Sequence, residues 1–594
     1  MKSAAAESKL LKGGAFLLEE VPPGDVFSPE DFTEEHRMIG RTTEDFVNNE
    51  VVPRLDDIEK LDLGLIRELL RKCGELGLLG VEVPESFGGL GLDKASATIV
   101  SEKMARAGSF TVSHSADTGI GLLPIVYFGS DEQKQKYLPR MVEGEICSAY
   151  ALTETGSGSD ATAAKARAVL SPEGTHYILN GEKMFITNAG FADIFITFAK
   201  IDGEKLSAFI VEKEFPGVST GAEEKKMGLH GSSTRVLILQ DALVPAGNLL
   251  GEVGQGAKIA FNILNIGRFK LGAICVGACK NVLGEATGYA NQRRQFGKPI
   301  SSFGAIQHKL AEICLRAWAA ESMVYRTLGM IDARLKDTDL TNGAQVLEAI
   351  EEYAVECSII KVLGSEVLSY AVDEGVQIYG GYGFIRDYPM ERHYRDARIN
   401  RIFEGTNEIN RLLIPGMLMK RAIKGQLPLL NAAQKLMGEL LAPAPLEEDS
   451  GALLEAERRA VTAAKKISLL ILGAAAQKFG TGLADEQEVL MSASNIIMDT
   501  YTMESALLRA LKKAAAEGAE KTVLVLDITR TLINDAVGRI ELEARQALAA
   551  ISEGDTLRTH LAALRKLLRH TPLNTVAARR RIAQAVIRAE GYPL

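Results

Sequence analysis

Apolar residues recur at helical spacing along most of this chain, and one internal segment departs from that pattern. From about Thr33 to Gly144, runs such as LGLIRELLRKCGELGLLG place leucine and isoleucine three or four positions apart, which predicts amphipathic helices. VPESFGGLGLD interrupts these helices with the proline and glycines typical of a turn. The first part of the chain is therefore predicted to be all-helical.

Between about Ile146 and Leu249 the pattern changes to short β-branched and aromatic runs. ILNGEKMFITNAG, DIFITFAK and LSAFIVEK are punctuated by Gly, Asn and Asp, as strands and their turns are. Helical spacing returns after GEVGQGAKIA and continues to about Ile423. The Pro-rich, acidic stretch LLAPAPLEEDSG then precedes a final Ala/Leu/Arg-rich part, which is again helical in period.

These patterns predict a mainly α-helical protein with a central β domain. The predicted divisions are an N-terminal extension (1–31), a helical domain (32–145), a β domain (146–252), a second helical domain (253–425) and a C-terminal helical extension (426–594) with a linker at about 440–451. A length of 594 residues is too great for one hydrophobic core, which also predicts several domains.

Composition and charge exclude several classes of protein. Hydrophobic residues make up 46% of the chain and charged residues 24%, as in ordinary globular proteins. A net charge of −9 provides no basic field, so no nucleic-acid partner is expected.

The six scattered cysteines are typical of a reduced protein, and Cys275 and Cys279 are predicted to pack on a helix face rather than form a redox pair. The N-terminus lacks the sustained apolar core of a secretory signal, so a cytoplasmic location is expected.

Several well-known motifs are missing from the sequence. It contains no GxxxxGK[ST], HExxH or CxxC, which argues against P-loop NTPases, zincins and zinc ribbons, and no metal site is expected. The glycine-rich GSGSD precedes a β region instead of forming a strand-to-helix turn, so a nicotinamide site is not predicted.

Three polar and aromatic clusters have the composition of a cofactor site. YALTETGSGSD (150–160) presents hydroxyls and backbone amides, and KMFITNAG offers the ring of Phe185 and the hydroxyl of Thr187 to a planar ligand. In NQRRQFGKPISSFGAIQ, Arg293 suits a pyrophosphate, and Phe296 suits an adenine or a partner helix. Taken singly, the three clusters also fit a polar loop, a half-buried strand and a solvated helix end.

A fourth cluster, QIYGGYGFIRDYPMERHYRDARINRIFEGTNEINR, places two glycine pairs and a carboxylate among aromatic and aliphatic neighbours. With the other three in the same order, it resembles the acyl-CoA dehydrogenase family over about Phe32 to Ile423. The resemblance implies a helical domain, a β-barrel-like domain and a four-helix bundle. FAD is then expected between the β domain and the bundle, with its adenosine end reaching a neighbouring subunit of a homodimer.

Site residues follow from the resemblance position by position. The implied FAD contacts are Tyr150, Leu152, Thr153, Gly158, Ser159, Phe185, Ile186, Thr187, Arg293, Gln295, Phe296, Gln377, Gly380, Gly381, Thr406 and Glu408. The implied substrate contacts are Ser159, Asn265, Arg268 and Gly405. The family often has Trp where Phe185 stands, and the aromatic face is retained here.

Glu404 in IFEGT resembles the family's catalytic base. Some members carry the carboxylate on an earlier helix, directly before an arginine, and here that position is Gly267. The α-proton of a thioester is only weakly acidic, so the base must be made more basic. Burial of Glu404 among Ile399, Ile402 and Phe403 is expected to raise its pKa by desolvation.

The resemblance implies FAD-dependent α,β-dehydrogenation of acyl-CoA thioesters to trans-2-enoyl-CoA in fatty acid β-oxidation, with electrons passed to an electron-transfer flavoprotein. An acyl-CoA oxidase that uses oxygen is one alternative, and sequence alone does not separate the two. A non-catalytic CoA-binding or assembly protein of the same fold is another. Such a scaffold would not need a base such as Glu404 beside a flavin.

The C-terminal extension resembles the extra helical domain of very-long-chain acyl-CoA dehydrogenases, which are homodimers with peripheral membrane attachment. In LPLLNAAQKLMGELL one predicted helix face carries Leu430, Ala433, Met437, Leu440 and Leu441. We favour packing of this face on its own domain over a peripheral membrane contact.

The resemblance also indicates where the acyl tail ends. The segment VSHSADTGIGLLP is implied to line the far end of the tail, and it carries the small or apolar residues Val112, Ala116, Gly119 and Gly121. This predicts a long tunnel and a preference for long-chain acyl-CoA.

Overall fold

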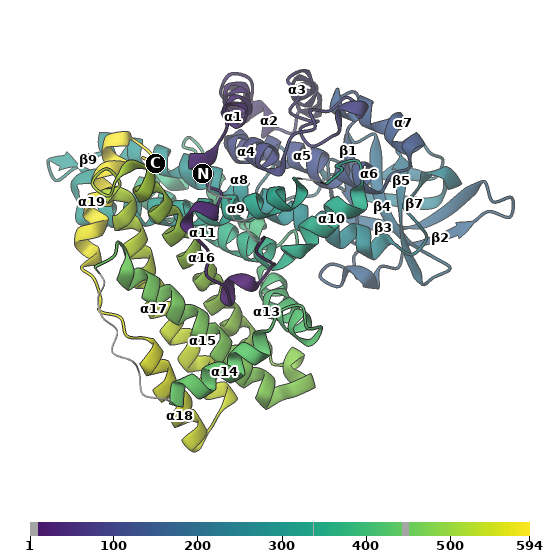
Figure 1. Ribbon diagram of the computed structural model, residues 1–594. Helices are drawn as coiled ribbons and strands as arrows, with labels where there is room; N and C mark the ends of the chain where they lie inside the picture. Colours follow the sequence, from purple (N-terminus) through teal and green to yellow (C-terminus); the bar gives the residue numbers. More distant parts are fainter. Residues whose placement is uncertain (1–9, 337, 442–450) are drawn as a thin grey trace, which may run out of the picture.

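The computed structural model describes residues 10–336, 338–441 and 451–594, and it confirms a mainly helical protein with a central β domain and an additional C-terminal helical domain (Figure 1). Most of the predicted linker at about 440–451 lies outside the described residues. In Figure 1 the β domain lies at one end of the molecule, and the C-terminal helices extend below the central helices.

The first helical region packs against the middle of the molecule. Its helices are α1 (Glu34–Phe46), α2 (Leu55–Ile58), α3 (Leu63–Glu75), α4 (Lys94–Met104), α5 (Ser109–Ser115), α6 (Leu123–Phe128) and α7 (Asp131–Val142). Side-chain caps fix where four of them begin, because Thr33, Asp62, Asp93 and Ser130 each accept a backbone N–H of the first turn. A π-helical segment, η8 (Ala116–Gly121), joins α5 to α6.

The β domain is built around one sheet. Its strands are β1 (Ser148–Ala151), β2 (Arg167–Leu170), β3 (His176–Thr187), β4 (Ile194–Ile201), β5 (Lys205–Glu212), β6 (Val218–Thr220), β7 (Thr234–Pro245) and β8 (Leu249–Leu250). The strand order is β6-β7-β3-β2-β4-β5-β8, and β1 pairs in parallel with β4. The antiparallel pairing of β3 with β7 shifts register between Lys183 and Ile186, which marks a β-bulge.

Long helices form the centre of the molecule. They are α8 (Gly256–Gln292), α9 (Gly304–Leu335), α10 (Gly343–Glu352), α11 (Ala354–Tyr379), α12 (Met390–Ala397) and α13 (Asn407–Ile423). A short hairpin, β9 (Arg294–Gln295) and β10 (Lys298–Pro299), projects between α8 and α9. Cys275 and Cys279 are fully buried in α8, which confirms that they pack in the core.

The C-terminal domain is entirely helical in its described part. Its helices are α14 (Leu429–Leu441), α15 (Glu455–Phe479), α16 (Gln487–Glu517), α17 (Val523–Ile551), α18 (Gly554–Leu567) and α19 (Thr575–Ala589). The face of α14 that packs on α15 carries Leu429, Ala433 and Leu436, whereas Leu430 is exposed. The predicted face therefore packs on its own domain, as we favoured, through Ala433, Met437 and Leu440, and the inclusion of Leu430 was wrong. Peripheral membrane contact stays an untested alternative.

Residues 10–31 lie between the central helices and the C-terminal domain (Figure 1). The N–H of Gly14 donates to Oε1 of Glu356 on α11 at 2.7 Å, and the ring of Phe16 lies 4.7 Å from that of Tyr501 on α16. Lys465 of α15 donates to the carbonyl of Glu19. This segment therefore contacts both helical domains, although 342 and 446 positions of sequence separate the residues in these two hydrogen bonds.

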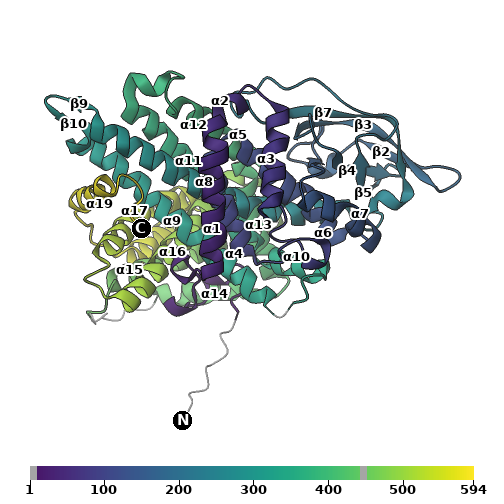
Figure 2. The same cartoon turned by 90° about the horizontal axis from the view of Figure 1, so that it is seen from above.

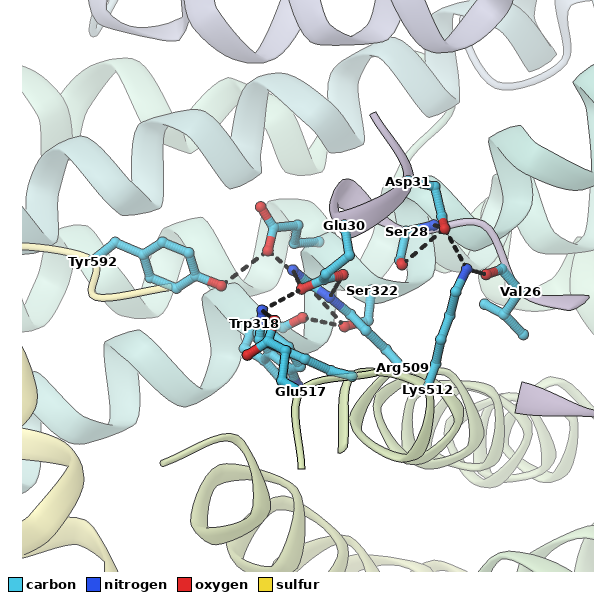
Figure 3. Close-up of polar contacts among 12 residues, drawn as sticks. Val26, Ser28, Glu30, Asp31, Trp318, Ser322, Arg509, Lys512, Glu517 and Tyr592 are labelled. Carbon is cyan, nitrogen blue, oxygen red and sulfur yellow. Dashed lines mark hydrogen bonds and ion pairs between the residues drawn. The ribbon is translucent and has the colours of Figure 1, made fainter. Parts of the chain in front are cut away.

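Arg509 of α16 is the centre of that junction (Figure 3). Its guanidinium donates to both oxygens of Glu30 (2.9 and 3.0 Å) and to Oε2 of Glu321 on α9 (2.6 Å). It also lies 3.6 Å from the ring centroid of Trp318. Tyr592, which follows α19, donates its hydroxyl to the same Glu321 oxygen (2.9 Å), so the extension, central helices and C-terminal domain meet at one buried ion cluster.

Candidate active site

The loop that carries Glu404 has an unusual backbone. Glu404 and Gly405 both have positive φ, +58° and +81°, and Thr406 caps α13 by accepting the N–H of Ile409. The side-chain amide of Asn410 donates to the carbonyls of Glu404 (3.4 Å), Gly405 (2.9 Å) and Thr406 (3.1 Å). A left-handed conformation at a non-glycine residue persists only where its surroundings enforce it. The loop is therefore held in a fixed and strained shape.

This shape directs the Glu404 side chain towards α8. A Cβ added at Gly267 would lie 2.6 Å from Oε2 and 3.0 Å from Oε1 of Glu404, so the carboxylate occupies the space that glycine leaves open. Oε2 is buried and has no hydrogen-bond partner among the described residues. The hydroxyl of Tyr150 is likewise buried and has no hydrogen-bond partner among the described residues. Burial raises the pKa of Tyr150, and the negative charge of Glu404 raises it further. Ile402 does not contribute to this burial as predicted, because it is 48% exposed.

The surroundings of Glu404 tune its ionisation. Burial raises its pKa to about 7, while the positive charges of Arg268 and Lys361 act in the opposite direction. Arg268 is itself buried, and it donates to the side chain of Asn265 (2.9 Å) and to the carbonyl of Glu404 (3.3 Å). A carboxylate whose pKa lies near neutrality is suited to removing a proton at physiological pH.

An aromatic side chain projects from the β domain at the bulge in β3. Phe185 has a φ of +58° and is 62% exposed, whereas Ile186 is buried and Thr187 half-buried. A bulge re-aims a side chain that regular alternation would place elsewhere. The ring of Phe185 therefore presents an open apolar face.

The loop 150–159 runs beside this strand. The N–H of Met184 donates to the carbonyl of Thr153 (2.8 Å), and the ammonium of Lys183 donates to the carbonyl of Leu152 (3.3 Å). Gly158 and Ser159 are exposed at the end of the loop. The structure thus brings two of the predicted clusters together.

The remaining predicted contacts gather elsewhere. The exposed residues of this second group are Arg293, Gln295, Phe296, Gln377, Gly380 and Gly381. Arg293 lies 5.6 Å from the ring centroid of Tyr382, and Phe296 is 92% exposed at the tip of the β9–β10 hairpin. Both views place this hairpin at the end of the molecule opposite the β domain (Figures 1 and 2). A single chain therefore does not bring Arg293 to Phe185.

The residues present fit the flavin implied by the resemblance. Phe185 offers an exposed aromatic face for a planar ring, and the unpartnered Tyr150 hydroxyl and Glu404 carboxylate leave polar atoms for ligands. The exposed fork of Arg293 suits a pyrophosphate. Glu408 is exposed at the start of α13, and the described residues contain no group of three His, Cys, Asp or Glu side chains that could hold a metal ion.

Two features of the site differ from or extend the sequence analysis. A Cβ at Gly121 would lie 2.0 Å from Oγ of Ser148, so Gly121 is small because it packs on β1 and not because it lines a tunnel. Sequence reasoning also missed Lys361, whose ammonium donates to the carbonyl of Gly405 (2.6 Å). Its only signal was a single cation within the apolar run SIIKVLG of α11.

Comparison with known proteins gives matches along almost the whole chain. Family models described as the acyl-CoA dehydrogenase N-terminal, middle and C-terminal domains match residues 33–145, 149–242 and 254–418, and a further C-terminal domain model matches 463–566. A probable acyl-CoA dehydrogenase of Bacillus subtilis (strain 168) is 54% identical over 584 residues, which is 98% of either chain. The mitochondrial very long-chain specific acyl-CoA dehydrogenase of Rattus norvegicus is 38% identical over 70% of this chain and 62% of its own.

Among solved structures, the crystal structure of an acyl-CoA dehydrogenase complexed with FAD from Bacillus anthracis is similar throughout. Its TM-score is 0.96 at 53% identity, and the match covers 98% of this chain and 100% of that chain. The similarity therefore includes the C-terminal helical domain.

Proposed function

The chain belongs to the acyl-CoA dehydrogenase family and is an FAD-dependent enzyme, and from this premise we propose that Glu404 removes the α-proton of an acyl-CoA thioester. The observation that carries the proposal is the buried, unpartnered Oε2 of Glu404 on a loop of fixed shape. The product is a trans-2-enoyl-CoA, and the reaction is the oxidative step of fatty acid β-oxidation.

The residues of the chain supply the proton chemistry. Oε2 of Glu404 accepts the α-proton, and the rigid loop lets the backbone N–H of Glu404 face the thioester oxygen as negative charge develops there. Arg268 donates a hydrogen bond to the backbone carbonyl of Glu404 and so fixes it, and burial keeps water from the Glu404 carboxylate. When bound, FAD supplies the acceptor for the hydride that leaves the β-carbon.

The test is turnover of the FAD-loaded protein with acyl-CoA. Because Glu404 must be ionised to act, kcat/KM is expected to rise with pH through a pKa of about 7 and to level off above it. We expect electrons to pass to an electron-transfer flavoprotein, with little hydrogen peroxide in air. Peroxide in step with substrate consumed would instead identify an acyl-CoA oxidase.

We further propose that the enzyme is a homodimer in which the two separated clusters form one FAD site across the subunit interface. Arg293→Ala is expected to lower FAD retention and to dissociate the dimer, because the guanidinium would bind the partner's cofactor. Arg294→Ala is the matched control, since the side chain of Arg294, among the described residues, bonds within its own hairpin, to the carbonyl of Gly297. Light scattering and the visible spectrum measure both effects, and a flavin-loaded monomer or a tetramer would contradict the arrangement.

We also propose a preference for long acyl chains, which rests on the small residues Ala116 and Gly119 of η8. Ala116 is buried there, and replacing it with Phe is expected to block the tail of long substrates only. Each buried methylene contributes about 0.8 kcal/mol to binding, so blocking several should lower kcat/KM for palmitoyl-CoA at least 10-fold, roughly, while butyryl-CoA is nearly unaffected. Ala116→Ser, which adds one atom, serves as the control. A wild-type optimum at butyryl-CoA would rule the preference out.

A further inference from the structure

Lys361 of α11 is fully buried, and its ammonium ends at the loop that carries Glu404. It donates to the carbonyl of Gly405 (2.6 Å) and to Oδ1 of Asn407 (2.8 Å). Asn407 is held in turn, because its amide donates to Oγ of Ser365 (3.0 Å). Lys361 therefore connects a rigid central helix to the peptide that follows Glu404.

Lys361 is unusual for a buried lysine because its ammonium is not paired with a carboxylate among the described residues. In the described part of the chain Lys361 forms no salt bridge, so its hydrogen bonds are to uncharged oxygens. Buried ammonium groups ordinarily pair with a carboxylate, because burial removes their hydration. Because no salt-bridge partner among the described residues offsets the positive charge of Lys361, this charge acts on the Glu404 carboxylate.

The charged and titratable groups around Lys361 come from each element that packs against it. Glu404 lies on the loop, Glu408 on α13, and Arg268 and Cys275 on α8. Burial lowers the pKa of Lys361 to about 8, and Glu404 is the largest influence that raises it again, so the ammonium is mostly charged at neutral pH. In return, Lys361 is one of the two cations that lower the pKa of Glu404.

Resting on the proposed role of Glu404 as the base, we propose that Lys361 is a positioning residue for that base. Its hydrogen bond fixes the carbonyl of Gly405 and so holds the left-handed turn at residues 404 and 405. Its positive charge keeps the Glu404 carboxylate ionised at a lower pH than burial alone would allow. One side chain thus serves both the shape of the loop and the ionisation of the base.

Two variants separate these effects. Lys361→Gln keeps a hydrogen-bond donor without charge, and Lys361→Met removes both. The rate of flavin reduction is measured against pH in FAD-loaded protein at limiting palmitoyl-CoA. In both variants the acid limb of this pH profile should move to higher pH by about 1 unit. At pH 7 this lowers the rate roughly five-fold, because the ionised fraction falls from about one half to about one tenth. At alkaline pH the Gln variant should recover, while the Met variant keeps a lower plateau.

A second readout does not depend on turnover. Hydrogen exchange of the segment 400–410, followed by mass spectrometry, should be faster in the Met variant and close to wild type in the Gln variant. Lys309→Met is the matched control, because Lys309 also contacts α11, through Glu374, away from the loop. This control should leave both the pH profile and the exchange of the loop unchanged.

An acid limb that stays in place in the variants would overturn the role of Lys361. If the Met variant does not retain FAD, the Gln variant decides, since an unmoved limb there is sufficient to reject the proposal. Glu404→Gln reports separately on the base. Flavin reduction at the parental rate in that variant would reject the proposed function. If Glu404→Gln instead reduces its flavin slowly, and the acid limb stays in place in the Lys361 variants, only the positioning role is rejected.

Discussion

Glu404→Gln is expected to retain FAD and to bind acyl-CoA while flavin reduction slows by about 10²–10⁴-fold. The amide keeps the shape of the side chain in the space beside Gly267 but cannot accept the α-proton. Stopped-flow spectroscopy of the flavin under anaerobic conditions measures the rate directly.

The control for this substitution is Glu182→Gln. Glu182 is an exposed carboxylate on β3, three residues before Phe185. Surface substitutions usually change stability by no more than about 0.5 kcal/mol, so replacing Glu182 should leave the fold intact and the rate within about two-fold of wild type. Reduction of the Glu404→Gln flavin as fast as this control would show that another group is the base.

Arg509→Met is expected to lower the free energy of unfolding by about 3–5 kcal/mol, because a buried ion cluster loses its central cation. Glu30 and Glu321 both lose their shared partner, and each keeps a second cation: Lys280 remains bonded to Glu321, and Lys513 remains 3.5 Å from Glu30. Denaturant titration followed by circular dichroism measures the change. The extension, central helices and C-terminal domain should separate earlier in the titration than in wild type.

Arg545→Met is the matched control for Arg509. Arg545 pairs with Glu541 one turn away on α17, and both side chains are more than 40% exposed. Exposed pairs of this kind contribute only about 0.3–0.5 kcal/mol. Equal loss of stability in the two variants would contradict the role given to the buried cluster.

Local patterning was sufficient to predict the class of fold. The 3.6-residue spacing of the long helices and the change to β-branched runs before α8 are properties of neighbouring residues, so they are visible in the sequence. The role of residues 10–31 was not visible, because Glu30 binds Arg509 across 479 positions of sequence. The spacing of apolar residues carries no information about a contact between residues so far apart in the sequence.

The site was predicted in composition but not in shape. Resemblance identified Glu404 and Phe185, yet the positive φ of each residue arises from packing that strand or helix periodicity does not encode. The burial of Glu404 was assigned to its sequence neighbours Ile399, Ile402 and Phe403, whereas the structure leaves Ile402 exposed and places the carboxylate against Gly267 of a distant helix. Lys361 lies 44 positions before the carbonyl it holds, and a single lysine in an apolar helix carries no motif.

The central claim, that this enzyme starts oxidation by removing the α-proton of an acyl-CoA, is tested most directly by isotope substitution at that carbon. Anaerobic bleaching of the FAD absorbance should be compared for palmitoyl-CoA and its α-dideuterated form. We predict bleaching by both substrates, slower with the deuterated one, and in both cases faster as pH rises through about 7. FAD-loaded protein that no acyl-CoA bleaches, whatever its chain length, would contradict the account.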